Sequence, residues 1–133
     1  MDAERIDIAR RCLAAAHDGT MDFPGIVGML MDAGFEGYHV DYRCGTSTYH
    51  LPCGNHIVLP SGQGRTDIAP LFRADKVEAA VQEAQAGGPG YTYHGFCDKV
   101  AAAGCAGYMV SFCGRRVVYY GRTAETHVEH FPQ

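Results

Sequence analysis

The sequence lacks several features that would place it in a specialised class of protein. No apolar run approaches the about 18 residues that a membrane-spanning helix needs, so no membrane partner is expected. The first residues, MDAERIDIARR, contain no apolar stretch of the signal-peptide kind, and we expect a cytoplasmic protein. A basic excess is also missing. The 11 Lys and Arg against 15 Asp and Glu give a formal net charge of −4, which disfavours nucleic acid as a partner.

Recognisable catalytic and cross-linking patterns are missing as well. The chain has neither a G-x-S-x-G nor an H-E-x-x-H motif, and we predict no cofactor. Its six cysteines do not form the clustered framework of a small disulfide scaffold, so reduced thiols are expected. The run from Cys44 to His56 has the spacing C-x5-H-x2-C-x2-H, which fits no structural zinc pattern. Cys97 and His94 are three residues apart, which is more typical of a helix surface than of a nucleophile and its base.

What the sequence does contain is an internal repeat. Residues 23–50 align without a gap to residues 93–120, at a constant offset of 70, and seven of the 28 positions are identical. The shared core is A-G-x-x-G-Y-x-V, which includes Tyr38 in the first copy and Tyr108 in the second. Because the matches extend over a whole supersecondary unit, we interpret them as an internal duplication.

Each copy has the pattern of two helices followed by three strands. Apolar residues recur at helical spacing before a glycine in each helix, and alternation with turn residues follows. The expected helices are 4–16, 23–33, 74–85 and 93–103, and the expected strands are 38–43, 47–51, 56–59, 108–113, 116–121 and 127–131. The sequence therefore predicts an α+β fold: an internally duplicated α-α-β-β-β unit whose antiparallel sheet has helices packed on one face. We expect one domain over 1–133, with repeats at about 4–59 and 74–131 joined by a Gly/Pro-rich loop at 60–72.

The alternation of side chains predicts which face of the sheet is buried. Aromatic and β-branched residues share one face of each hairpin and are expected to pack on the helices. They are Tyr38, Val40, Tyr42 and Tyr49 in the first copy and Tyr108, Val110, Phe112 and Tyr119 in the second. Two-residue turns at Cys44-Gly45 and at Gly114-Arg115 would set the register, with His39 opposite His50.

The opposite face carries the candidate site. His39, Asp41 and His50 would lie close together there, with Tyr120 from the second copy as a wall of a ligand-binding depression. Two histidines and a carboxylate can bind an anion, hydrogen-bond one another, or hold a metal through His39 and His50, although we predict no metal as the first choice. A solvated sheet face is the simplest alternative.

Both halves of the chain resemble a known family. The segment from Gly104 to Arg122, GCAGYMVSFCGRRVVYYGR, and the later HVEHFP, together with FPGIV and AGFEGYHVDY in the first half, resemble the YbcV/YdfO-like family of small bacterial proteins. Members of that family are sometimes labelled phage envelope proteins. The resemblance implies an α+β fold and no established activity, cofactor or catalytic residue.

Three interpretations of function follow. We favour a non-enzymatic module that binds a small molecule or a protein through the open sheet face. The second is an enzyme that uses His39, Asp41 and His50 for acid–base or metal-assisted chemistry. The third is a homodimer formed through Met109, Val118 and Tyr120, because exposed apolar patches often mark interfaces.

Overall fold

The structure is a computed structural model that describes residues 1–132. Within those residues the order α-α-β-β-β occurs twice, as predicted, and the ends of the predicted elements are right to within three residues. The elements are α1 (Ala3–Asp18), α2 (Phe23–Asp32), β1 (Gly37–Asp41), β2 (Thr46–His50), β3 (His56–Pro60), α3 (Ala74–Ala86), α4 (Tyr93–Ala102), β4 (Cys105–Ser111), β5 (Arg116–Gly121) and β6 (Thr126–His130).

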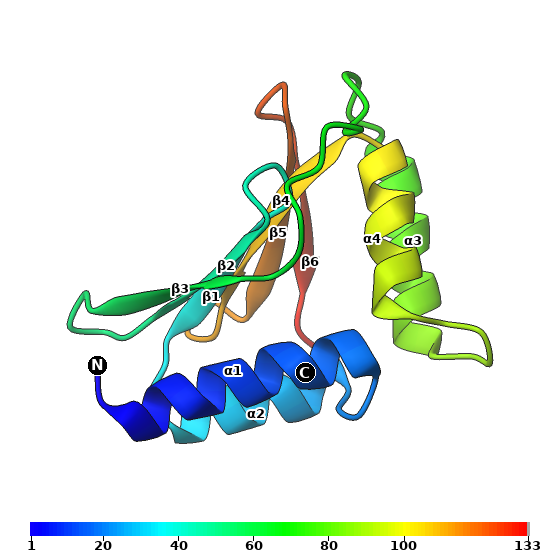
Figure 1. The fold of residues 1–133 in the computed structure, drawn as a ribbon. Helices are drawn as coiled ribbons and strands as arrows, with labels where there is room; N and C mark the ends of the chain where they lie inside the picture. Colours follow the sequence, from blue (N-terminus) through cyan, green and yellow to red (C-terminus); the bar gives the residue numbers. More distant parts are fainter. Residues whose placement is uncertain (133) are drawn as a thin grey trace.

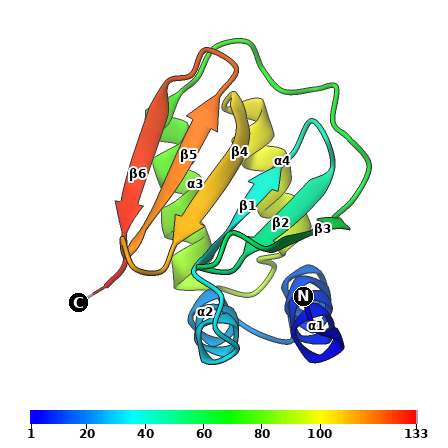
Figure 2. The same ribbon diagram turned by 90° about the vertical axis from the view of Figure 1, so that its left-hand side faces the viewer.

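The six strands form one antiparallel sheet in the order β3-β2-β1-β4-β5-β6. All four helices lie on one side of it (Figure 1), which confirms the predicted α+β architecture. Because the sheet twists strongly, α1 and α2 lie beneath its β1–β3 half in Figure 1, while α3 and α4 lie beside its β4–β6 half. Figure 2 looks onto the other face, which no helix covers. No helix in residues 1–132 has the length and apolar character needed to cross a membrane.

The two halves meet at β1 and β4 in a way consistent with duplication. Gly37 pairs with Ser111, and Asp41 pairs with Gly107. Gly107 is the equivalent of Gly37 in the second repeat, and Ser111 is the equivalent of Asp41, so exchange of the two repeats converts one pair into the other. His39 pairs with Met109, its own equivalent in the second half. An approximate two-fold axis therefore crosses the sheet between His39 and Met109.

The hairpin register differs from the sequence prediction by two residues. His39 lies opposite Thr48, and not opposite His50, because four residues, 42–45, connect the strands in place of the two expected. The Asp41 carboxylate explains the longer loop, since its Oδ1 accepts hydrogen bonds from the backbone amides of Arg43 at 3.0 Å and Cys44 at 3.1 Å. A shift of two leaves every side chain on its predicted face.

The second hairpin departs from the prediction in the same manner. Ser111 lies opposite Arg116, and the four residues 112–115 form the loop. The Ser111 hydroxyl accepts a hydrogen bond of 2.9 Å from the amide of Gly114, in the role that Asp41 has in the first hairpin. Arg115 adopts a positive φ of 52°, where the first repeat has Gly45 at 69°. Both loops therefore belong to one conformational class.

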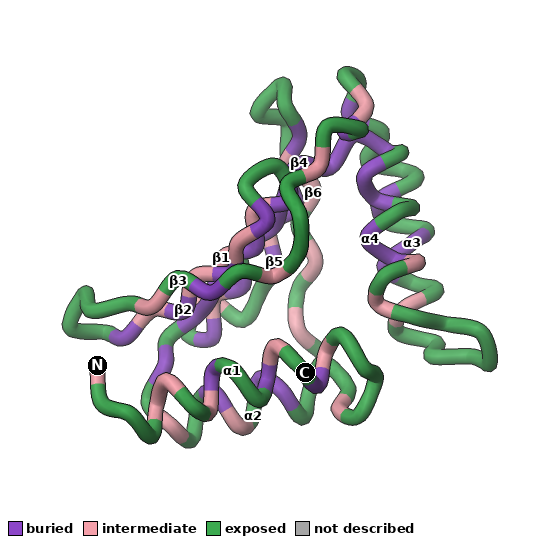
Figure 3. The backbone as a smooth tube through the Cα atoms, viewed as in Figure 1, coloured by how far each residue is buried: buried purple, intermediate pink, exposed green. Residues whose placement is uncertain are grey.

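The core lies between the helices and the inner face of the sheet (Figure 3). All eight residues predicted to face the helices are buried, and Tyr38 and Tyr108 each keep 7% of their surface exposed. The inner face is dominated by tyrosine rings, whose hydroxyls need partners when they are buried. The Tyr93 hydroxyl from α4 lies 2.8 Å from that of Tyr108, whereas the Tyr42 hydroxyl has no partner within the described chain.

Two equivalent glycines end α2 and α4. Gly34 and Gly104 follow the C-caps with φ of 94° and 90°, as the A-G-x-x-G motif predicts. At the other ends of these helices, Asp22 and Thr92 cap equivalent amides. The motif therefore sets the residue at which each helix ends, just before the first strand of its repeat, β1 or β4.

Candidate functional site

The uncovered face of the sheet consists of three rows of residues that run across all six strands. One row, here called the acidic row, contains the carboxylate of Asp41: Pro60, Thr46, Asp41, Gly107, Tyr120 and Thr126. The middle row is Val58, Thr48, His39, Met109, Val118 and Val128. The third, here called the basic row, is His56, His50, Gly37, Ser111, Arg116 and His130. All four residues of the predicted site lie on this face.

His39 and Tyr120 are in direct contact at the centre of this face. The His39 Nε2 and the Tyr120 hydroxyl oxygen are 2.7 Å apart, although the two residues lie on β1 and β5 with β4 between them. The Tyr120 side chain crosses β4 over Gly107, where an added Cβ would lie 2.4 Å from the hydroxyl oxygen. An aromatic side chain over a strand glycine covers backbone that would otherwise be bare. The sequence placed Tyr120 near the site, but the part that Gly107 plays was not predicted.

The protonation states of this pair follow from their partial burial. Burial lowers the pKa of His39 below the ordinary imidazole value, with a smaller effect in the same direction from His50 and an opposing one from Asp41. Burial raises the pKa of Tyr120 to about 12. Tyr120 therefore keeps its proton at neutral pH, and which of the two groups donates the hydrogen bond depends on the tautomer of His39.

Asp41 and His50 have other neighbours. Asp41 holds the β1–β2 loop through its hydrogen bonds to Arg43 and Cys44. The His50 ring lies beside that of His56 on β3, with 5.7 Å between their centroids. His39, Asp41 and His50 thus share a face, but no hydrogen bond or ion pair joins them within residues 1–132. In the described chain no three His, Cys, Asp or Glu side chains are grouped closely enough to hold a metal ion.

The middle row exposes three apolar side chains, with Thr48 and His39 between the first and the second. Val58 and Met109 are each 52% exposed and Val128 is 38% exposed, and they lie at one end, near the centre and at the other end of the same row. Val118 between Met109 and Val128 is half-buried. An aligned row of this kind is typical of a contact surface and not of scattered surface residues.

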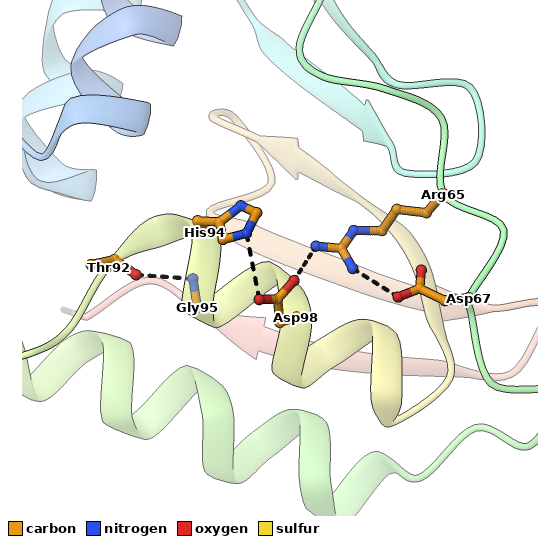
Figure 4. Close-up of polar contacts among 6 residues, drawn as sticks. All are labelled: Arg65, Asp67, Thr92, His94, Gly95 and Asp98. Carbon is orange, nitrogen blue, oxygen red and sulfur yellow. Dashed lines mark hydrogen bonds and ion pairs between the residues drawn. The ribbon is translucent and has the colours of Figure 1, made fainter.

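A second polar cluster lies on the helix side and holds the segment between β3 and α3, which connects the two repeats, against α4 (Figure 4). The Arg65 guanidinium binds Asp67 at 3.2 Å and Asp98 of α4 at 2.5 Å, while the Arg65 amide donates to the carbonyl of Tyr42. The Arg65 hydrogen bond lowers the pKa of Asp98. His94 lies 3.6 Å from Asp98 and is largely exposed, whereas Cys97 is buried. These contacts give the cluster a structural role.

Neither of the two cavities that the structure describes is lined by the predicted site residues. One, of about 390 Å³, lies between α1 and the end of β3, and the other, of about 30 Å³, lies between α3 and α4. Sequence reasoning predicted neither, because the spacing between a helix and a sheet edge depends on packing across the whole core. The six cysteines are free, and Cys12, Cys97 and Cys105 are buried as small apolar side chains.

The protein has a duplicated α+β fold in which helices cover one face of the sheet and leave the other face open. The chain belongs to the family described as "Protein of unknown function (DUF1398)", whose model matches residues 12–129. No curated protein matches the sequence.

Proposed function

We propose that the protein is a non-enzymatic binding module and that its open sheet face docks a second copy of this chain. The observation that carries the proposal is the middle row, which exposes Val58, Met109 and Val128 in one line on the face that no helix covers. Burial of such side chains against their equivalents in another copy removes apolar surface from water.

The charges on either side of the middle row favour a second copy as the occupant. The acidic row contains Asp41 and no basic residue, whereas the basic row contains Arg116 and three histidines and no acidic residue. Rotation of a second copy by 180° about the middle row places its acidic row over the basic row of the first. The middle rows then face each other, while Asp41 lies over Gly37 of the other copy, one strand away from His50 and two strands away from Arg116.

The size of the face sets the expected strength of the dimer. Six strands about 4.8 Å apart and five residues long, at about 3.4 Å per residue, give a footprint of roughly 400–500 Å² per copy. That footprint lies at the low end for specific interfaces, and the twist of the sheet concentrates contact near His39 and Met109. We therefore expect a weak dimer that forms reversibly with concentration.

The predicted site residues acquire roles within this contact. His39 and Tyr120 form its fixed polar centre, since their hydrogen bond holds both rings against the sheet. Asp41 and His50 lie in opposite rows, and the rotation places Asp41 over Gly37 and His50 over Thr46 of the other copy. The resemblance to YbcV/YdfO-like proteins is compatible with a binding role, because it brings no catalytic residue.

The test is the molar mass in solution, measured by light scattering from about 10 µM to 1 mM, a range suited to a weak dimer. The unmodified chain should move from 14.4 kDa toward 28.8 kDa, twice that value, as concentration rises. Met109→Lys places a charge at the centre of the contact and should keep the chain monomeric throughout.

Leu71→Lys is the matched control, because Leu71 is 71% exposed but lies in the loop between β3 and α3. It should dimerise like the unmodified chain. Circular dichroism confirms that both variants fold. A chain that stays at 14.4 kDa at 1 mM, or a Met109→Lys variant that dimerises normally, overturns the proposal.

A further inference from the structure

The larger of these two cavities lies between α1 and the end of β3, and at Pro60 it reaches the edge of the open face. Its walls come from one face of α1 and from the end of β3 with the first loop residues after it. The lining residues are Arg10, Leu13, Ala14, His17, Leu59, Pro60, Ser61 and Gly62. It is a depression of about 390 Å³ that is open to solvent, and five of its eight lining residues are exposed. The cavity is therefore large enough to admit a ligand of several non-hydrogen atoms.

The polar groups around this cavity are cationic at the rim and neutral elsewhere. Arg10 and His17 are its only ionisable lining residues, and no acidic side chain lines it. Within residues 1–132, Arg10 takes part in no ion pair or side-chain hydrogen bond, in contrast to Arg11, which binds Asp7 at 2.9 Å. A free guanidinium beside an apolar wall can form two parallel hydrogen bonds with a carboxylate.

The wall and the rim are held in place by the core. Leu59 is buried, with 5% of its surface exposed, and Leu13 beside it is half-buried. The His17 ring stacks on Tyr93 of α4, with 5.5 Å between the centroids, and the Tyr93 hydroxyl is in turn bonded to Tyr108. The cavity thus has an apolar floor and a fixed aromatic edge, which reduces the entropy lost when a ligand binds.

Two of the lining residues differ in size from their equivalents in the second repeat. The positions equivalent to Ser61 and Gly62, 70 residues later, are Phe131 and Pro132. Phe131 packs edge-on against Phe23 at 5.8 Å between centroids. The first repeat has small residues where the second has large ones, so space remains beside α1.

We propose that this cavity binds a small organic anion with an apolar body, of the class of aliphatic or aromatic carboxylates. The carboxylate lies against the Arg10 guanidinium. The hydrocarbon body lies on Leu13 and Leu59, between α1 and the end of β3. Of the lining residues only Pro60 belongs to the open face, at the end of its acidic row.

The experiment titrates the full chain, labelled with ¹⁵N, with sodium octanoate and follows the backbone amides by NMR. The amides of Leu13, Ala14 and Gly62 should shift together and reach saturation. Arg10→Gln should weaken binding by about tenfold, as expected when one charge-assisted contact is lost. Arg11→Gln is the matched control on the same helix, and it should bind as the unmodified chain does.

Two further experiments distinguish the contribution of the ligand's charge from that of the shape of the cavity. 1-Octanol, which has the same chain without the charge, should bind at least about fivefold more weakly than octanoate, about 1 kcal/mol at 25 °C. Ser61→Phe introduces the side chain that the second repeat has at this position, and it should abolish saturation while the remaining amide spectrum shows an intact fold. The proposal is overturned if octanoate gives no saturable shifts at these amides, if both arginine variants weaken binding equally, or if Ser61→Phe binds normally.

Discussion

Two equivalent glycines offer a sharp test of how the duplicated fold is held together. Gly34 and Gly104 occupy the same place in the two repeats and have nearly the same backbone, with φ of 94° and 90°. Their surroundings differ. A Cβ at Gly34 would meet only the Arg5 guanidinium, at 3.5 Å, whereas a Cβ at Gly104 would lie 2.1 Å from the carbonyl oxygen of Leu71 and 2.9 Å from the Cα of Phe72.

The magnitudes follow from these distances. Substitution by alanine places a side chain at positive φ in both cases, which costs about 1–2 kcal/mol. At Gly34 nothing more is added, because a contact of 3.5 Å with a flexible side chain is ordinary. At Gly104 the loop before α3 must move as well, and such overpacking adds about 1–3 kcal/mol. We expect losses in the free energy of unfolding of about 1–2 kcal/mol for Gly34→Ala and about 2–5 kcal/mol for Gly104→Ala.

The assay is urea unfolding followed by far-ultraviolet circular dichroism, since the chain has no tryptophan to report by fluorescence. Protein concentration is kept low and equal for all samples so that dimer formation does not contribute. Equal losses in the free energy of unfolding for the two variants would refute the reasoning, because the cost of a side chain at positive φ would then account for both.

Three further outcomes are expected. Burial puts the folded-state pKa of His39 below its unfolded value of 6.5, so the unfolded chain binds the proton first as pH falls. The free energy of unfolding should therefore fall as pH drops below 6.5, and the His39→Gln variant, compared with the unmodified chain in urea titrations at each pH, should show a smaller fall. Tyr42→Phe removes an unpartnered buried hydroxyl and should leave thermal stability unchanged or raised, while Tyr93→Phe breaks a hydroxyl pair and should lose about 1 kcal/mol; a greater loss for Tyr42→Phe would contradict this account. Arg65→Ala should raise the pKa of Asp98 toward its ordinary value in an NMR titration, and an unchanged pKa would show that the ion pair is not formed in solution.

The sequence was sufficient for the elements and for the two faces of the sheet. Both depend on local periodicity, and the period of two in a strand survives an error in turn length as long as the error is an even number of residues. That is why His39 and His50 lie on the predicted face although their pairing was wrong. The loop length depended on the hydrogen bonds of Asp41 and Ser111, residues that had been assigned to the face and not to the turn.

The features that sequence reasoning missed depend on contacts between distant elements. Tyr120 reaches His39 only because the intervening residue of β4 is Gly107, and this requires the strand order as well as the register. The cavity beside α1 depends on the gap between a helix and a sheet edge, which no local pattern encodes. One signal lies beyond the aligned segments at the same offset of 70: Ser61 and Gly62 are small, whereas the residues 70 positions later are Phe131 and Pro132.

Contact between the open faces of two copies is the central claim, and an isotope-filtered nuclear Overhauser experiment tests it most directly. The sample mixes ¹³C-labelled and unlabelled chains at a concentration where the dimer is populated. We predict intermolecular contacts from the Met109 methyl to the Met109 and Val118 methyls of the other copy, since the two-fold arrangement brings the centres of the middle rows together. Intermolecular contacts confined to the helices, or none at all at 1 mM, would contradict the account.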